Sequence, residues 1–143
     1  MDTTLVDSNV ILDIATNDPT WAEWSSQALE TAANESRLAI NALIYAEVSI
    51  GYERVEEMEQ AIPSATFRRE PLPYEAAFLA GKAFLQYRRR GGLRTSPLPD
   101  FYIGAHAAVS NFRLLTRDPR RYRAYFPTVD LIVPKEVRPT ARR

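Results

Sequence analysis

The chain has 143 residues, of which 45% are hydrophobic and 25% charged, and this suits one soluble globular domain with a single core. No apolar run approaches the roughly 20 residues of a membrane span, and no signal peptide is evident, so we expect a cytoplasmic protein without membrane contact. Cysteine is absent and the one histidine is His106, which excludes disulfides and argues against thiolate metal sites and the usual zinc sites.

The net charge of zero conceals two halves of opposite sign. Residues 1–80 carry 14 acidic and four basic side chains, a net −10, and residues 81–143 carry the reverse, a net +10. Sixteen of the 18 basic residues are arginine, whose guanidinium group matches phosphate geometry. The asymmetry indicates a nucleic-acid or charged protein partner, or else two halves that neutralise each other across the fold.

Short apolar segments alternate with helical patterns along the whole chain. We expect strands at 3–6, 37–41, 65–70, 113–117 and 130–134. Between them we expect helices from about 9 to 17, at 20–35, 42–62, 72–91 and 100–111, a loop at 94–99 and a short helix within 118–126.

Three helix boundaries have a specific local signal. The first helix should end before Asp18-Pro19, because proline disfavours a helical residue before it. Thr20 is the expected N-cap of the next helix, with Glu23 completing a capping box. Gly51 is the point at which the 42–62 helix would break.

Strands that alternate with helices indicate a parallel sheet covered on both faces. We therefore predict an α/β fold, a three-layer sandwich whose central sheet of short parallel strands is flanked by helices. Residues 1–134 form one domain in this prediction, and residues 135–143 a disordered basic tail. Sites in open sheets of this kind form at the carboxyl ends of the strands.

Two acids stand directly after predicted strands. Asp7 follows the first strand in the stretch TLVDSNVILDIA (4–15), and Asp118 follows the strand at 113–117. Asp7 either caps the next helix or holds a metal ion. Asp118 could likewise be only an N-cap, with proline at the first helical position.

Two further acids lie on helices at positions where apolar residues surround them. Glu47 falls on the stripe formed by Leu43, Ile44 and Ile50, where a buried carboxylate is costly unless it is paired, hydrogen-bonded or bound to metal. The alternative is that this stripe is exposed or that Glu47 pairs with an arginine. Asp100 opens the 100–111 helix, where capping alone is also a sufficient reason for an aspartate.

The four acids together make the structural alternatives less satisfactory. Carboxylates that converge without a counter-charge repel one another, and a divalent cation such as Mg²⁺ or Mn²⁺ removes the conflict. The chain has no obvious buried lysine to replace the cation and no histidine–serine or cysteine–histidine pair for nucleophilic catalysis.

Four segments, VDSNVILD, AEVSIGY, LPDFYIGAHA and LLTRDPRRY, resemble the PIN domain in their order and spacing. The length and short loops are similar to the toxin ribonucleases of VapBC-type toxin–antitoxin pairs, and the resemblance runs from about residue 3 to residue 134. Ser8 stands where threonine is common in that family, and Gly104 where alanine is common.

The resemblance implies a metal-dependent endoribonuclease toxin that cleaves RNA with Mg²⁺ or Mn²⁺. Asp7 and Asp100 match direct metal ligands, Glu47 a ligand or an orienting residue, and Asp118 an acid that acts through water or a second ion. It also implies a cognate antitoxin, bound in a hydrophobic groove of the early helices, and a homodimer.

Other residues near the four acids are candidates for supporting roles. Ser8, Asn9 and Thr116 could orient the ligands, whereas for Asp13 a favourable charge in the first turns of a helix is preferred. Arginines near the acids could hold RNA phosphates or could be ordinary surface residues: Arg88, Arg89, Arg90, Arg94, Arg117, Arg120 and Arg121.

Two other classes of function remain open at this stage. One is a catalytically silent module of the PIN shape that binds RNA or protein. The other is a phospho-acceptor signalling domain, which would need a lysine near the acids. Lys82 lies within a predicted helix and Lys135 in the tail, which disfavours the second class.

Overall fold

The computed structural model describes residues 2–96 and 98–135. Within them, twelve elements follow in chain order: β1 (Thr3–Val6), α1 (Ser8–Ala15), α2 (Ala22–Glu35), β2 (Arg37–Ile40), α3 (Ala42–Ser49), α4 (Val55–Ala61), β3 (Phe67–Arg69), α5 (Tyr74–Arg89), α6 (Pro99–Ser110), β4 (Arg113–Leu115), α7 (Arg120–Tyr125) and β5 (Leu131–Ile132). Each predicted strand and helix is present.

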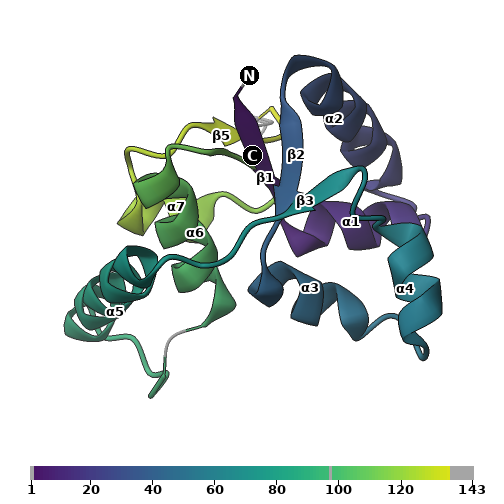
Figure 1. The fold of residues 1–143 in the computed structure, drawn as a ribbon. Helices are drawn as coiled ribbons and strands as arrows, with labels where there is room; N and C mark the ends of the chain where they lie inside the picture. The colour runs from purple at the N-terminus through teal and green to yellow at the C-terminus, as the bar shows by residue number, and fades with distance from the viewer. Residues whose placement is uncertain (1, 97, 136–143) are drawn as a thin grey trace, which may run out of the picture.

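The strands form one parallel sheet in the order β3-β2-β1-β4-β5. Strand β1 lies at its centre, with Leu5 opposite Ala39 of β2 and opposite Leu114 of β4. Helices α1 to α4 gather on one side of the sheet and α5 to α7 on the other (Figure 1). The predicted α/β sandwich is therefore confirmed.

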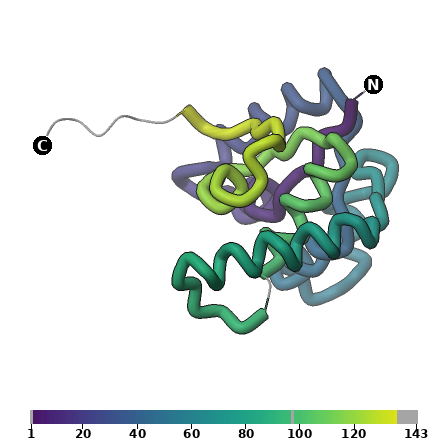
Figure 2. Tube along the Cα trace, turned by 90° about the vertical axis from the view of Figure 1, so that its left-hand side faces the viewer, coloured from purple at the N-terminus to yellow at the C-terminus, as the bar shows by residue number. Residues whose placement is uncertain are grey.

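The core consists of the central strands and the helix faces that cover them. Leu5, Val6 and Leu114 are fully buried, as expected for strands of a parallel sheet that is covered on both faces. Helix α5 runs along one side of the molecule beside α6, which it contacts extensively (Figure 2). Among the described residues, no helix is both long enough and apolar enough to cross a bilayer.

The helix expected at 42–62 is broken, as the position of Gly51 suggested. Helix α3 ends at Ser49, residues near Gly51 form turns, and α4 begins at Val55. Asn41 caps α3, because its side-chain oxygen accepts a hydrogen bond from the backbone N–H of Ile44 at 3.0 Å.

The predicted N-cap of α2 is wrong. The helix starts at Ala22 with Trp21 at the N-cap position and no side-chain cap from Thr20. The Asp18 carboxylate accepts hydrogen bonds from the backbone N–H groups of Thr20 and Trp21 at 3.0 and 2.7 Å. These hydrogen bonds form a turn at Asp18 that precedes the helix, and α2 begins two residues after Thr20.

Close packing at Gly104 joins α6 to α7 and the segment after it. A Cβ atom at this position would lie 2.6 Å from Cε2 of Phe126 and 3.0 Å from Cδ1 of Tyr122. Both rings are buried, so they hold α7 against α6. The predicted tail, apart from Lys135, lies outside the described residues.

Candidate functional site

Asp7 lies at the carboxyl end of the central strand, beside the end of β4. Its backbone N–H donates to the carbonyl oxygen of Leu115, and this parallel pairing brings Thr116 next to it. The Thr116 hydroxyl donates to Oδ2 of Asp7 at 2.9 Å. The meeting of two strand ends follows from the sheet order.

The Asp7 carboxylate also caps α1. Its Oδ1 atom accepts the backbone N–H of Ser8 at 2.8 Å, and Asp7 is the N-cap residue. Capping uses one oxygen only, whereas Oδ2 points to the hydroxyls of Thr116 and Tyr122. The two alternatives for Asp7, a helix cap or a site residue, are thus compatible.

Asp100 reaches the same site from the start of α6. Pro99 and Asp100 stand in the first turn after the N-cap residue Leu98, so Asp100 is favoured by the helix dipole but is not the cap. Its Oδ1 atom lies 3.5 Å from the Tyr122 hydroxyl, which donates to Oδ2 of Asp7 at 2.9 Å. One hydroxyl therefore stands between the two carboxylates.

Tyr122 is a residue of the site that the sequence pattern did not predict. The side chain is 1% exposed and comes from the short helix α7. A buried tyrosine needs a partner for its hydroxyl. The available signal in the sequence was that Tyr122 follows the candidate acid Asp118 by four residues in RDPRRY. The structure identifies Tyr122 as the residue that connects Asp7 with Asp100.

Glu47 is half-buried on α3 and accepts a hydrogen bond from the Ser8 hydroxyl at 2.9 Å. The apolar stripe expected around it is only partly correct. Ile44 is buried, but Ile50 is 87% exposed, because α3 ends before it and the chain turns. Because the stripe is buried at Ile44 and exposed at Ile50, Glu47 lies at the edge of the core and its side chain is only partly buried.

Asp118 lies on the outer side of the site, and its carboxylate pairs with Arg120 at 3.2 Å in an exposed ion pair. It shares a pocket with Asp100. Hydrogen bonds from the side chain and backbone of Arg120 lower the pKa of Asp118. Asp118 is therefore ionised at neutral pH and already has a counter-charge.

The three inner acids, Asp7, Glu47 and Asp100, have pKa values that are shifted in the opposite direction. Burial is the main cause that raises the pKa of Asp7, and the charge of Asp100 raises it further. Burial also raises the pKa of Glu47, again with contributions from the charges of Asp7 and Asp100. Burial and the charge of Asp118 raise the pKa of Asp100 against the opposing effect of Arg121. The acids thus interact with one another as a cluster of excess negative charge.

This cluster predicts a pH dependence of the metal-free protein. A carboxyl group whose pKa is raised on folding contributes stability that is complete below its unfolded pKa and is lost as the pH rises through its folded pKa. The free energy of unfolding that these three acids contribute should therefore grow as the pH falls from 7 towards 4. Chemical denaturation across this range measures it, with the triple variant Asp7→Asn, Glu47→Gln, Asp100→Asn as the reference. A constant difference between the two proteins would contradict the prediction.

Tyr122→Phe tests the hydroxyl between Asp7 and Asp100. The ring and its packing remain, but Asp7 stays buried with one donor fewer, which should cost about 1.5–3 kcal/mol at pH 7. The same hydrogen bond lowers the pKa of Asp7, so the cost should shrink at low pH, where Asp7 is protonated. An equal cost at pH 7 and pH 4 would indicate a packing defect instead.

The donor set suits a hard divalent cation. Carboxylate oxygens are the ligands that Mg²⁺ and Mn²⁺ prefer, and the mutual repulsion of the inner acids would be relieved by a cation. Among the residues that the structure describes, however, no three histidine, cysteine, aspartate or glutamate side chains form a group that could hold a metal ion as they stand. Asp7 and Asp100 lie at the Tyr122 hydroxyl, while Glu47 is held by Ser8 and Asp118 by Arg120.

The residues predicted to orient ligands lie around these acids. Ser8 holds Glu47, and Thr116 holds Asp7. The side chain of Asn9 donates to the Thr116 hydroxyl at 3.1 Å, and its oxygen accepts the backbone N–H of Arg117 at 3.3 Å. These contacts order the site in its present form, and an orienting effect on a bound metal stays a prediction.

Asp13 has partners that the sequence did not predict. It lies in the second turn of α1, 3% exposed, where it accepts a hydrogen bond from the Ser25 hydroxyl and forms an ion pair with Arg117 at 2.8 Å. The Arg117 guanidinium also lies over the Trp21 ring. Asp13 therefore connects α1 with α2 through Ser25 and with the segment after β4 through Arg117. Its carboxylate has the Arg117 guanidinium as its counter-charge.

The other predicted RNA-contacting arginines lie on the surface near α5 and α7. Arg90 lies over the Tyr125 ring, and Arg121 over the rings of Tyr87 and Phe101. Arg120 pairs with Asp118, and Arg88 donates to the Arg94 carbonyl oxygen. Arg89 and Arg94 are exposed.

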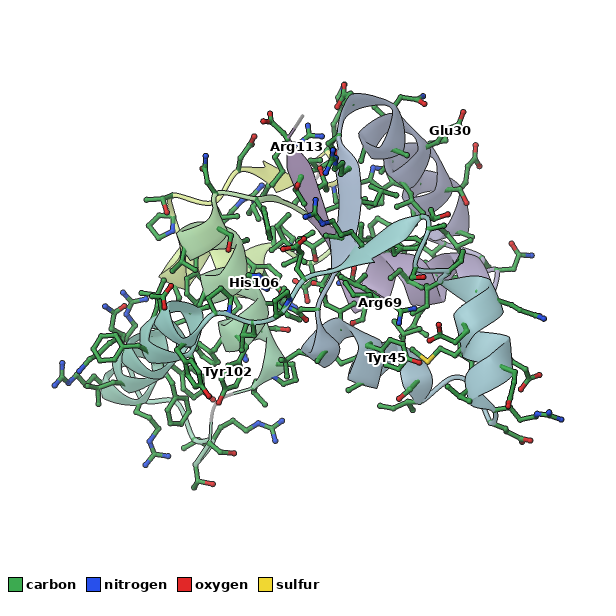
Figure 3. The ribbon with its side chains drawn as sticks, in the orientation of Figure 1. Glu30, Tyr45, Arg69, Tyr102, His106 and Arg113 are labelled. Carbon is green, nitrogen blue, oxygen red and sulfur yellow. The ribbon has the colours of Figure 1, made fainter. Side chains whose placement is uncertain are left out.

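His106 has a structural place outside the acidic site. It is buried, and the Asn41 amide nitrogen contacts its Nδ1 atom at 3.0 Å. Because the Asn41 oxygen is used by Ile44, the amide donates and Nδ1 accepts, which fits a neutral ring. Burial lowers the pKa of His106 in the same sense. Figure 3 shows His106 on α6 near the middle of the molecule.

The fold and site define an α/β protein with acidic side chains gathered where the strands of a short parallel sheet end. A family model described as "PIN domain" matches residues 4–127, most of the chain. The protein belongs to the PIN domain family, and the family prediction made from the sequence is confirmed.

Solved structures similar to this chain include VapBC complexes and a structure described as a toxin–antitoxin complex. A VapBC2 complex of Rickettsia felis bound to promoter DNA has a TM-score of 0.71 at 17% identity, covering 93% of this chain and 99% of that one. A Klebsiella pneumoniae toxin–antitoxin complex has a TM-score of 0.68 at 23% identity, covering 94% and 99%. The FitAcB structure of Neisseria gonorrhoeae has a TM-score of 0.67 at 21% identity, covering 90% of this chain and 95% of that one. At these identities the similarity establishes the fold. Comparison with curated proteins finds no match.

Proposed function

We propose that this protein is a metal-dependent endoribonuclease toxin that a cognate antitoxin neutralises. The observation that carries the proposal is the convergence of Asp7 and Asp100 on one buried hydroxyl in a PIN domain, with Glu47 and Asp118 near enough to interact electrostatically with them. Buried carboxylates that repel one another lower the stability of the fold, and a bound cation would relieve this repulsion. The similar toxin–antitoxin structures support the biological setting.

Asp7 and Asp100 would hold Mg²⁺ or Mn²⁺, with Glu47 and Asp118 as further ligands or as groups that position water. When bound, such an ion lowers the pKa of a coordinated water and stabilises charge on the phosphate. Thr116, Ser8 and Asn9 keep the carboxylates in place through the contacts described above. Attack by water in line with the leaving oxygen would yield 5′-phosphate and 3′-hydroxyl ends.

The test is cleavage of purified RNA with Mg²⁺ or Mn²⁺, with a chelator and with an Asp100→Ala variant as blanks. We expect cleavage that stops with either blank and products with 5′-phosphate ends. Cleavage that is unaffected by chelator would refute the metal dependence. Cyclic phosphate ends would refute attack by water.

Two alternative functions have separate outcomes. A silent PIN module would leave RNA intact and would still arrest growth when Asp7 is replaced by asparagine. A phospho-acceptor domain would be labelled by a small phosphodonor. The second has little support, because Lys82 lies on the exposed face of α5 over the Phe78 ring, and Lys135 follows β5.

Protein partners are the remaining part of the proposal. An open, mainly apolar pocket of about 440 Å³ is lined by Tyr45 and Ala42 of α3 together with Arg69 to Pro71. Tyr45 and Arg69 face each other there, with the Arg69 guanidinium 5.1 Å from the ring centre (Figure 3). Exposed Ile50 and Phe78 add apolar surface outside the acidic site. These features support a complex with an antitoxin and a homodimer, which co-purification and light scattering would detect.

A further inference from the structure

Asn41 and His106 form a buried polar pair between two helices that carry acids of the site. Asn41 is the N-cap residue of α3, His106 lies on α6, and both side chains are buried. The Asn41 amide nitrogen lies 3.0 Å from Nδ1 of the His106 ring. The proposed reaction gives this pair no role, so its presence in the core needs another reason.

The two residue types are specific to this contact. Serine, aspartate and asparagine cap a helix about equally well, but only asparagine has a separate N–H donor besides the capping oxygen. Asn41 uses both groups, because its oxygen accepts the Ile44 N–H at 3.0 Å while its nitrogen donates to His106. A buried polar ring is costly without such a partner. Capping and packing alone would therefore be served by other residue types at both positions.

The pair joins two helices that gather on opposite sides of the sheet (Figure 1) and contact each other. Among the described residues, no other side-chain hydrogen bond joins α3 or its cap to α6. Phe112, just after α6, packs against the imidazole with ring centres 5.4 Å apart, and this contact restricts the orientation of the His106 ring. The hydrogen bond therefore fixes one point of α3 relative to α6.

Each of the two helices carries an acid of the site at the same separation from the pair. Glu47 follows Asn41 by six residues, and Asp100 precedes His106 by six residues. Six residues of an α-helix span about 9 Å along its axis, a length over which a helix bends little. The two acids are close enough to interact, since the charge of Asp100 contributes to the raised pKa of Glu47. A shift of α3 relative to α6 would therefore change the separation of these carboxylates.

We propose that Asn41 and His106 are positioning residues, which set the distance between the Glu47 and Asp100 carboxylates by holding the cap of α3 against α6. They act through these two acids and are not catalytic residues. The inference deepens the proposed function and rests on it where it concerns the metal, because Mg²⁺ demands near-ideal ligand geometry. Loss of the pair should therefore weaken metal binding without removing a ligand.

Three substitutions separate the hydrogen bond from capping and packing. Asn41→Ser keeps a capping oxygen for the Ile44 N–H but is too short to reach His106. His106→Leu fills the space of the ring but cannot accept a hydrogen bond, whereas His106→Asn keeps an acceptor close to the position of Nδ1 although it packs less well. The control Thr4→Val removes a different buried hydrogen bond, which joins Thr4 to Ser36 at 2.7 Å near the amino ends of the strands.

Spin labels measure the spacing of the two helices in the metal-free protein. The chain has no cysteine, so Ala46→Cys on α3 and Val109→Cys on α6 direct the labels to two exposed positions. Asn41→Ser and His106→Leu should broaden or shift the distribution of label distances, whereas His106→Asn and Thr4→Val should retain it. Thermal denaturation checks that every variant is folded. An unchanged distribution in folded Asn41→Ser and His106→Leu would overturn the inference.

Calorimetric titration with Mn²⁺, without the spin labels, measures the consequence for the site. Mutations in a network that couples two positions change binding by about twofold to thirtyfold, and we expect losses in this range for Asn41→Ser and His106→Leu. The double variant should bind no more weakly than either single variant, because both remove the same interaction. His106→Asn and Thr4→Val should bind Mn²⁺ as the wild type does.

The outcomes distinguish this inference from the proposed function. Losses that add in the double variant, or an equal loss in His106→Asn and His106→Leu, would overturn the hydrogen bond as the cause. Changed label distances with unchanged Mn²⁺ affinity would overturn the role of the pair in placing the acids. Absence of Mn²⁺ binding by the wild type would refute the metal-dependent function, whereas label distances that change only in Asn41→Ser and His106→Leu would still support the positioning of α3 on α6.

Discussion

Asp7→Asn should abolish RNA cleavage and at the same time stabilise the metal-free protein. Residues that merely orient metal ligands contribute about 10- to 100-fold to activity or affinity, so loss of a proposed ligand should cost at least about 100-fold. Stability should rise at pH 7, because burial and Asp100 make the Asp7 charge unfavourable. Asparagine can still accept from the Ser8 N–H and donate to the neighbouring hydroxyls.

Cleavage assays and urea denaturation measure the two effects on the same preparations. Mg²⁺ should raise the unfolding temperature of the wild type but not that of Asp7→Asn, since binding to the folded state alone stabilises it. Asp2→Asn, which removes an exposed acid five residues earlier, is the control and should change neither property. A destabilised Asp7→Asn protein would mean that the carboxylate has mainly a structural role.

Gly104→Ala should destabilise the protein although alanine is the better helix former. The added Cβ would lie 2.6 Å from Cε2 of Phe126 and 3.0 Å from Cδ1 of Tyr122, and both rings are too buried to move aside easily. Overpacking of this kind costs about 1–3 kcal/mol, against about 1 kcal/mol gained in helix propensity. We expect a net loss of free energy of unfolding and reduced cleavage, because Tyr122 also holds Asp7.

Gly81→Ala is the matched control on α5. No atom outside its own local helix lies within 4 Å of the added Cβ, so the same substitution should stabilise the protein by about 0.5–1 kcal/mol. Equilibrium denaturation of both variants gives the difference directly. Equal effects of the two substitutions would show that packing against Phe126 does not limit this position.

Several features of the site depend on neighbours that a sequence does not reveal. Tyr122 connects Asp7 and Asp100, which lie 115 and 22 positions before it. Its role follows from where α7 packs on α6, and the Gly104 contact decides that packing. The pair of Asp13 and Arg117, likewise, forms across 104 positions. Hydrogen bonds of this length along the chain have no periodic pattern that could predict them.

Local competition explains other differences. Thr20 is the residue type expected at an N-cap, yet a turn at Asp18, whose carboxylate accepts the N–H groups of Thr20 and Trp21, precedes α2 and moves its start to Ala22. Ile50 belongs to the helical pattern of Leu43 and Ile44, yet the turn at Gly51 directs it to solvent. In both cases the sequence contained the competing signals, and only the path of the chain decided between them.

The sequence by itself determined the parallel sheet, the helix break at Gly51 and the position of Asp7 at the edge where strands end. The hydrophobic period of each segment acts over a short range, and the carboxyl ends of parallel strands lie at the same edge of the sheet. The tertiary structure alone decided that Asp7 and Asp100 share the Tyr122 hydroxyl and that Arg121 lies between aromatic rings. These contacts require packing of helices whose relative positions depend on the whole core.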